Sequence, residues 1–395
     1  DGTNGTDGSN GTDGIDGKSA YEIWLDNGHT GRQTDFLEWL KGKDGADGND
    51  GANGKDGNDG SNGTNGADGK SAYEIWLENG HTGSEADFLE WLKVPNENLQ
   101  YQAVKENGEI IGYSVVGLGN ISDTDVIIPT TYNKKPVLNI AEYTFSHCYS
   151  LTSITIPDGI ISIGSNAFYS CTSLTSVTIP DGVTSIGNSA FSGCSSLANV
   201  TLSDGVKSIG DSAFRGCTSL ASIDIPNSVT YIGAYVFNNT AYFNEQENWE
   251  DDVLYVGNYL ISAKTSLSGE YSLKQDTLLI ADNAFKDCGS LKNVTIVDSV
   301  KSIGNYAFEN CGGLTSIIIP EGVVSIGDYA FLNCYSVTSI VIPNSVVSIG
   351  EMACVTYSPL TTIYCVATEQ PSGWDDWWNP YEYTVVWGYE PEDLE

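Results

Sequence analysis

Nine cysteines and three histidines are the residues of this chain best suited to chemistry. Seven of the cysteines occupy one position of a repeated unit: Cys148, Cys171, Cys194, Cys217, Cys288, Cys311 and Cys334. If the repeated units stack as successive coils, their equivalent side chains point the same way. A disulfide instead needs Cβ vectors that face each other. We therefore expect a ladder of buried free thiols that act as small apolar residues. Cys354 and Cys365 lie off the ladder and are the one pair to test for a bond.

The remaining signals for catalysis are poor. None of the histidines lies in an H-E-x-x-H motif, and the sequence has no C-x-x-C motif, nucleophile elbow or P-loop. His147 directly precedes Cys148. The simplest interpretation of this pair is an exposed histidine beside one of the seven repeated cysteines. Asp375 and Asp376 lie among tryptophans and could mimic a sugar-binding or glycosidase cleft, but carboxylates beside an aromatic cluster need no such role. We predict no catalytic residue, no metal site and no cofactor.

The overall charge excludes some partners. The chain has 17 basic and 52 acidic side chains, a net charge of -35, whereas nucleic acid and anionic membranes select for lysine and arginine. It has no apolar run of the roughly 18 residues that a membrane span needs. We expect a soluble extracellular or virion surface. Because the chain begins inside a glycine triplet without methionine, we also expect a fragment or processed product.

Glycine occupies every third position from Gly2 to Gly17 and again from Gly42 to Gly69. This period is the requirement of a collagen triple helix, because only glycine fits at the axis where three strands meet. The second run would span roughly 85 Å at about 3.1 Å per residue. Since no proline occurs before Pro95, the triple helix should be weak by itself.

Two near-copies of one sequence follow the glycine runs, at residues 18–41 and 70–93. Each predicts two short helices, because capping-box spacings start them and Asn-Gly separates them. Each copy carries more apolar side chains than a hairpin of this length can bury, so we expect trimeric knots that set chain register. The predicted trimer contacts are Tyr21, Ile23, Trp24, Phe36, Trp39, Leu40, Tyr73, Ile75, Trp76, Phe88, Trp91 and Leu92. The alternative is a ligand site made by the tryptophans.

This combination of G-X-Y runs with S-A-Y-E-I-W-L and F-L-E-W-L-K resembles collagen-like segments of bacterial surface proteins and of phage tail or head fibres. The resemblance covers about the first 93 residues. It implies a fibrous, trimeric and exposed setting, and leaves bacterium and phage both open.

A 23-residue period begins near residue 136, as from Phe168 to Phe191. A fixed period of this size predicts a solenoid in which each coil buries its apolar side against the next. Within a unit, L-x-x-[IV]-x-I predicts a first strand, P-D-G a turn, and [VI]-x-S-I-G a second extended segment. The string x-x-A-F-x-x-C predicts a helical or looped return.

The recurring I-P-x-x-V-x-S-I-G-x-x-A-F-x-x-C string resembles the BspA-like leucine-rich repeat family over about residues 101–395. The resemblance implies a cell-surface or secreted protein that binds host proteins, other cells or polymers, and is not catalytic. The C-terminal sequence resembles the last unit of such domains. There, the core would be capped by Trp374, Trp377, Trp378 and Trp387.

The predicted fold class is therefore multidomain: a collagen-like triple helix with short α-helical hairpin inserts, followed by a β-rich leucine-rich-repeat solenoid. The expected segments are collagen-like 1–17, hairpin knot 18–41, collagen-like 42–69, hairpin knot 70–94, solenoid N-terminal cap 95–135, repeats 136–365 and C-terminal cap 366–395. An irregular insertion near 241–275 contains a sequence typical of a hairpin at 254–262. Two interpretations of this insertion stay open. It carries binding specificity, or it is a plain spacer.

A candidate ligand surface lies at the outward positions of the first strands. These positions are small and polar in early units and become more apolar later, at Ser316, Ile318, Ser339, Val341, Thr362 and Tyr364. Apolar residues side by side on a sheet suggest a contact surface. Alternatively, isoleucine and valine are simply good strand residues, or the cap covers them.

Together these features favour a non-enzymatic, homotrimeric surface fibre or adhesin, extracellular on a bacterial surface or secreted. It would present solenoid heads to a protein or glycan ligand on a cell surface or matrix. A phage tail or head fibre that binds a bacterial receptor is the main alternative. A polysaccharide-acting enzyme and a purely structural filament are less favoured.

Overall fold

The computed structural model describes residues 99–119, 124–359 and 361–390. The predicted collagen-like segments, the two hairpin knots and their trimer contacts lie outside the described residues, and the segment boundaries remain predictions. Residues from Pro95 to Glu395 belong to one compact unit.

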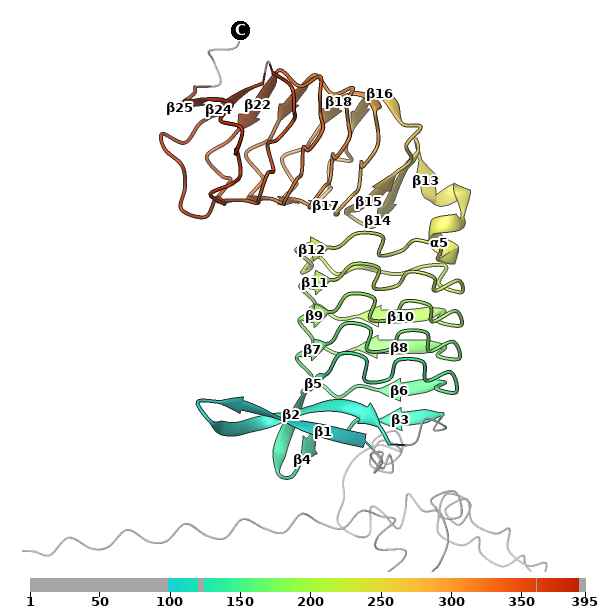
Figure 1. Cartoon of the computed structure of the whole chain (residues 1–395). Helices are drawn as coiled ribbons and strands as arrows, with labels where there is room; N and C mark the ends of the chain where they lie inside the picture. The colour runs from blue at the N-terminus through green and yellow to red at the C-terminus, as the bar shows by residue number, and fades with distance from the viewer. Residues whose placement is uncertain (1–98, 120–123, 360, 391–395) are drawn as a thin grey trace, which may run out of the picture. The chain divides into compact units, whose positions relative to one another are not determined.

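Within this unit, the described residues form a β-solenoid of about 12 turns (Figure 1). Each regular coil has two short strands joined by a turn, and a return made of successive tight turns. The strands of one coil pair in parallel with those of the next, in register with the 23-residue period, as Ser162 with Ser185 and Ser185 with Ser208. The period thus fixes which side chains stack along the solenoid.

The first strands of the coils form one layer. Their parallel pairs are β3 with β6, β8 with β10 and β16 with β18, followed by the four-stranded order β20-β22-β24-β25. The bounds are β3 Asp125–Ile127, β6 Ser153–Thr155, β8 Ser176–Ile179, β10 Asn199–Leu202, β16 Ser268–Ser272, β18 Ser290–Thr295, β20 Ser316–Ile318, β22 Ser339–Ile342, β24 Thr362–Cys365 and β25 Thr384–Trp387.

The second strands form another layer, built mostly from the two residues Ser-Ile of the S-I-G motif. These strands are β5 Lys135–Ile140, β7 Ser162–Ile163, β9 Ser185–Ile186, β11 Ser208–Ile209, β12 Tyr231–Ile232, β17 Leu279–Ile280, β19 Ser302–Ile303, β21 Ser325–Ile326 and β23 Ser348–Ile349. The motif glycine is required by the neighbouring coil: a Cβ on Gly187 would lie 2.5 Å from the backbone nitrogen of Ser165.

The remaining elements lie at the N-terminal end and in the insertion. Strand β2 pairs with β1 in an antiparallel hairpin and with β5 in parallel, so the hairpin joins the solenoid sheet, and β4 pairs with β5. The bounds are β1 Leu99–Glu106, β2 Glu109–Leu118, β4 Thr131–Tyr132, α5 Ala241–Asn244, η1 Gln246–Asn248, β13 Trp249–Glu250, β14 Val253–Val256 and β15 Tyr259–Ala263.

The return segment x-x-A-F-x-x-C is looped and contains no helix in the regular coils that the structure describes. The residue before the ladder cysteine has a left-handed backbone, with φ of 59° at Ser170, 76° at Gly193 and 62° at Asn310. Glycine and asparagine tolerate this region best. The return therefore turns sharply enough to aim both phenylalanine and cysteine inward.

Phenylalanine and cysteine form two parallel ladders in the core. The phenylalanine rings stack at 4.9 Å between Phe168 and Phe191 and at 5.5 Å between Phe191 and Phe214. These spacings match the distance of roughly 4.8 Å between paired strands. The seven ladder cysteines are free and buried, as the stacking of equivalent positions predicts, and Cys354 and Cys365 are free and buried as well. The two cysteines off the ladder stand in for core residues, since Cys354 follows Phe331 by one period and Cys365 pairs with Ile342.

The predicted hairpin at 254–262 is present as the antiparallel pair β14–β15. Its strand β14 is buried along its whole length. Leu254 and Val256 belong to the apolar core on the N-terminal side, whereas Val253 and Tyr255 belong to the core on the C-terminal side. The hairpin is therefore a partition whose two faces close two separate cores.

Three of the four predicted capping tryptophans close the C-terminal core. Trp374 and Trp378 are buried and their ring centroids lie 4.9 Å apart, while Trp387 packs 5.9 Å from Trp374. The prediction was wrong for Trp377, whose side chain is 66% exposed. Its backbone carbonyl accepts a hydrogen bond from Met352, which ties the residue to the last coil while its ring faces solvent.

Candidate binding surface

The predicted ligand positions lie on consecutive strands of one sheet. Parallel register places Ser316, Ser339 and Thr362 next to one another. The same register places Ile318 beside Val341, and Val341 beside Tyr364. The intervening residues Ile317, Ile340 and Ile363 are buried, so the predicted positions point away from the core.

A fourth residue continues the apolar line, because Val386 on β25 pairs with Tyr364. We call Ile318, Val341, Tyr364 and Val386 the apolar row. Ile318 is 63% exposed and Val386 is 37% exposed, while Val341 and Tyr364 are partly buried. The cap covers part of the row, since the rings of Tyr364 and Tyr389 lie 5.0 Å apart. The row is thus most open at its Ile318 end.

A groove with a volume of about 400 Å³ borders that open end. It lies where strand pairing is interrupted between β18 and β20, and Ile318 is one of the residues that line it. The polar side is formed by Glu270 and Asn293, joined by a hydrogen bond of 3.1 Å from the Asn293 amide to the Glu270 carboxylate. Apolar and hydrogen-bonding groups therefore meet along one sheet face.

Sequence reasoning missed Val386, Glu270 and Asn293. Counting back one period of 23 residues from Ser316 gives Asn293, and a second period gives Glu270. Val386 follows Tyr364 by 22 residues, so a strict period passes over it. Aligning T-I-Y-C with T-V-V-W would have found it.

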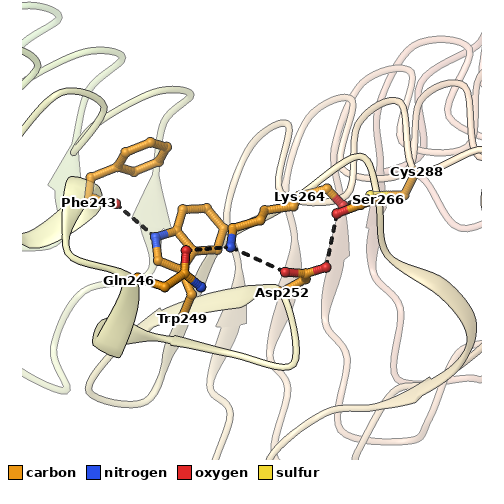
Figure 2. Close-up of polar contacts among 7 residues, drawn as sticks. All are labelled: Phe243, Gln246, Trp249, Asp252, Lys264, Ser266 and Cys288. Atoms are coloured by element: carbon orange, nitrogen blue, oxygen red, sulfur yellow. Dashed lines mark hydrogen bonds and ion pairs between the residues drawn. The ribbon is translucent and has the colours of Figure 1, made fainter.

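The insertion is held together by its own polar side chains, as Figure 2 shows. Lys264 forms an ion pair with Asp252, with Nζ and Oδ1 3.2 Å apart, and donates to Gln246 at 3.0 Å. Its ammonium also lies 5.0 Å from the ring centroid of Trp249. Hydrogen bonds from Ser266 and from Lys264 hold the pKa of the Asp252 carboxyl below its ordinary value. Because these groups are bonded to one another, the cluster stabilises the insertion.

The residues singled out for possible chemistry are a buried thiol, an exposed histidine and a hydrogen-bonded carboxylate. Burial raises the pKa of the Cys148 thiol to about 11, with Cys171 as a further cause, so the thiol is not a ready nucleophile. The adjacent His147 is exposed, and its Nδ1 lies 3.0 Å from the hydroxyl of Tyr149. Asp375 accepts a hydrogen bond from the backbone of Trp377 at 2.7 Å.

Among residues 99–119, 124–359 and 361–390, no cluster of histidine, cysteine and carboxylate side chains is arranged to hold a metal ion. Within the same part of the chain, no helix combines the length and apolar character needed to cross a membrane.

Comparison with known proteins adds a family match and several similar structures. Residues 138–268 and 269–370 match the family described as BspA type leucine rich repeat region, in six copies. No curated protein matches the chain.

The chain is also similar to three solved bacterial structures. A leucine rich cell surface protein from Faecalibacterium prausnitzii is 25% identical, with 75% of this chain and 98% of that chain covered and a TM-score of 0.27. The leucine rich repeat protein of T. pallidum is 20% identical, with 75% and 100% covered and a TM-score of 0.26. The pneumococcal vaccine antigen PcpA is 21% identical, with 75% and 85% covered and a TM-score of 0.33.

Proposed function

Because this chain belongs to the BspA-type leucine-rich repeat family, we propose that it is a non-enzymatic binding protein of a bacterial surface. The ligand is a protein or glycan on a cell surface or matrix. Its binding face is the outward side of β20, β22, β24 and β25. The net charge of -35 supports an exposed, soluble setting over binding to nucleic acid or anionic membrane.

The observation that carries this proposal is the apolar row. Contiguous apolar patches on a surface mark interaction sites, and this row joins the 63% exposed Ile318 to three further apolar side chains on adjacent strands. The row lies beside hydrogen-bonding groups such as Glu270 and Asn293. An apolar centre with a polar border is the usual composition of a protein-binding surface.

The G-X-Y runs and the copied inserts extend the proposal to a trimeric fibre. Three chains wound at their N-terminal parts would carry three solenoids as heads. The apolar residues of the inserts, including Trp24 and Trp76, would contact one another across the trimer. Linking three weak sites raises overall affinity through effective concentration, without any new contact.

The binding face is tested by one charged substitution and its matched control. Ile318→Asp places a carboxylate in the open end of the apolar row, whereas Thr178→Asp makes the same change at the equivalent exposed position of β8. The probe is an array of immobilised matrix proteins and glycans, with affinity then measured on each spot that binds the unsubstituted chain. We expect Ile318→Asp to weaken binding by about tenfold or more and Thr178→Asp to leave it unchanged. Equal binding by both variants would overturn the assignment.

A further inference from the structure

A second surface near the C-terminal end exposes aromatic rings rather than aliphatic side chains. Tyr335, Tyr357 and Tyr381, here called the tyrosine row, are 58%, 41% and 53% exposed. They lie on the loops that lead into β22, β24 and β25, which are neighbours in one sheet. The row therefore crosses three consecutive loops.

Direct contacts join two members of the tyrosine row, Tyr357 and Tyr381. The rings of Tyr357 and Tyr381 lie 5.2 Å apart in an edge-on arrangement, and their hydroxyl oxygens are 3.2 Å apart. The hydrogen bond to Tyr381 raises the pKa of the Tyr357 hydroxyl, and Tyr335 acts in the same direction. These phenols thus present oxygen atoms and ring faces at one place.

A ladder of side chains supports the row from the preceding coils. The Tyr335 hydroxyl donates to Asn333 at 3.1 Å, the Asn333 amide donates to Asn310 at 2.7 Å, and the Asn310 amide donates to Asp287 at 2.6 Å. In this series of three hydrogen bonds, each group donates to the next one in the direction of the Asp287 carboxylate. These hydrogen bonds therefore anchor the Tyr335 hydroxyl and leave its ring as the exposed group.

The sequence around the row has no cation of its own. Between residues 302 and 395 there are twelve aspartates and glutamates, and no lysine, arginine or histidine. One of the carboxylates is the exposed Glu382, which directly follows Tyr381. Rings and carboxylates are present together, but the positive partner that both attract is missing from this part of the sequence.

Elsewhere the same solenoid shows how it holds a cation. Three lysines each combine an aromatic ring with a carboxylate: Lys264 with Trp249 and Asp252, Lys274 with Tyr255 and Glu250, and Lys286 with Tyr306 and Glu309. In the last of these, the ammonium lies 5.7 Å from the ring centroid and 2.7 Å from the carboxylate. The C-terminal coils also expose tyrosine rings and carry carboxylates, but their sequence contains no lysine.

We propose that the tyrosine row docks a lysine- and arginine-rich segment of a partner protein. Each cationic side chain would lie against a phenol ring, with nearby carboxylates such as Glu382 attracting the excess positive charge. The tyrosine row shares no residue with the apolar row, so binding at each of the two surfaces can be tested independently.

The experiment must separate this docking from the attraction that any polyanion exerts on a polycation. The probe is a fluorescently labelled nona-arginine peptide, and its affinity for the full chain is measured by anisotropy at physiological salt. The variants are Tyr335→Ala, Tyr357→Ala and Tyr381→Ala combined, and the same three positions changed to phenylalanine. None of these changes alters the charge of the folded chain at neutral pH. The matched control is Tyr143→Ala with Tyr149→Ala, two tyrosines of the first coil that are 62% and 58% exposed.

We expect the triple alanine variant to bind about tenfold more weakly, since three exposed cation–π contacts are lost. The phenylalanine variant and the control should stay within about threefold of the unsubstituted chain, because a phenylalanine ring also attracts cations. Unchanged affinity of the triple alanine variant would assign the binding to bulk charge and overturn the proposal. An equal loss in the control, or no binding by the unsubstituted chain, would do the same.

A single exposed substitution keeps the test valid if the triple variant folds poorly. Tyr381→Lys supplies the chain's own cation beside the Tyr357 ring, as Lys286 does beside Tyr306. We expect this variant to exclude the peptide with a similar loss of affinity, while Tyr143→Lys, with the same charge change, binds normally. Equal binding by the two lysine variants would contradict the docking site.

Discussion

The thiol of Cys171 donates a hydrogen bond to the backbone carbonyl of Phe145, with Sγ and O 3.0 Å apart. The same contact, over the same 26 residues, joins Cys194 to Phe168 at 3.1 Å and Cys217 to Phe191 at 3.2 Å. Each carbonyl also accepts the backbone N–H of the cysteine in its own coil, as Phe145 does from Cys148. The cysteine ladder therefore links successive coils while it fills the core.

This arrangement predicts that the cysteines are hidden from reagents. The native chain should react with a chromogenic thiol reagent at none of its nine cysteines, because all of them are buried. After unfolding in guanidinium without reductant, all nine should react. A count of seven in the unfolded chain would instead reveal a disulfide, with Cys354 and Cys365 as the first pair to check.

Stability should fall at alkaline pH because the thiols are buried. Burial raises the pKa of the Cys217 thiol to about 12. The unfolded thiol loses its proton near its ordinary pKa of about 8.5, so the native state binds more protons above that pH. The stabilisation is complete below about pH 8.5 and is lost as the pH rises toward 12, at about 1.4 kcal/mol per pH unit for one thiol.

Urea unfolding at about pH 8 and pH 10 checks this effect. Cys217→Ala should be less stable than the unsubstituted chain at both pH values, since it leaves a cavity. Its loss of stability between the two should be smaller by about 2 kcal/mol, because one titrating thiol is gone. Identical losses in both proteins would show that this thiol does not titrate as its burial implies.

The partition made by β14 predicts that substitutions of adjacent residues destabilise different cores. Leu254 and Val253 are both fully buried, but Leu254 faces the N-terminal core and Val253 the C-terminal core. Leu254→Ala should cost roughly 2–5 kcal/mol and reduce hydrogen-exchange protection mainly in β11 and β12. Val253→Ala should cost about 2 kcal/mol and act mainly on β17 and β19. Equal loss of protection on both sides would mean that the two cores unfold as one.

Much of the solenoid could be predicted from sequence because each coil repeats the residue pattern of the one before. The spacing from Phe168 to Phe191 gave the period, and the alternation in L-x-x-[IV]-x-I gave the inward and outward faces. The apolar row followed from that alternation at Ile318, Val341 and Tyr364. These predictions needed only a local pattern that repeats.

The features that could not be predicted depend on tertiary contacts or unit lengths that the 23-residue repeat does not encode. Trp377 and Trp378 are adjacent in sequence, yet one is 66% exposed and the other 4%, since only the turn geometry of the cap decides which ring faces inward. The hairpin could be recognised, but its burial on both faces could not, because that depends on a core on each side. Val386 was missed since its unit is one residue shorter than the period.

The trimeric stalk makes a prediction that the solenoid alone does not. Residues from Pro95 onward form a compact unit with its own cores, so a chain that starts there should be monomeric. In the longer chain, Trp24→Ala with Trp76→Ala should weaken the trimer, because both tryptophans are predicted contacts between chains. Velocity sedimentation of these two proteins provides the comparison.

Presentation of three solenoid heads together is tested most directly by sedimentation equilibrium of the chain with both glycine runs intact. The chain mass is 42.3 kDa, and the predicted result is a single species of about 127 kDa, three times that mass. A species of 42.3 kDa across the same concentrations would contradict multivalent binding by a trimeric fibre.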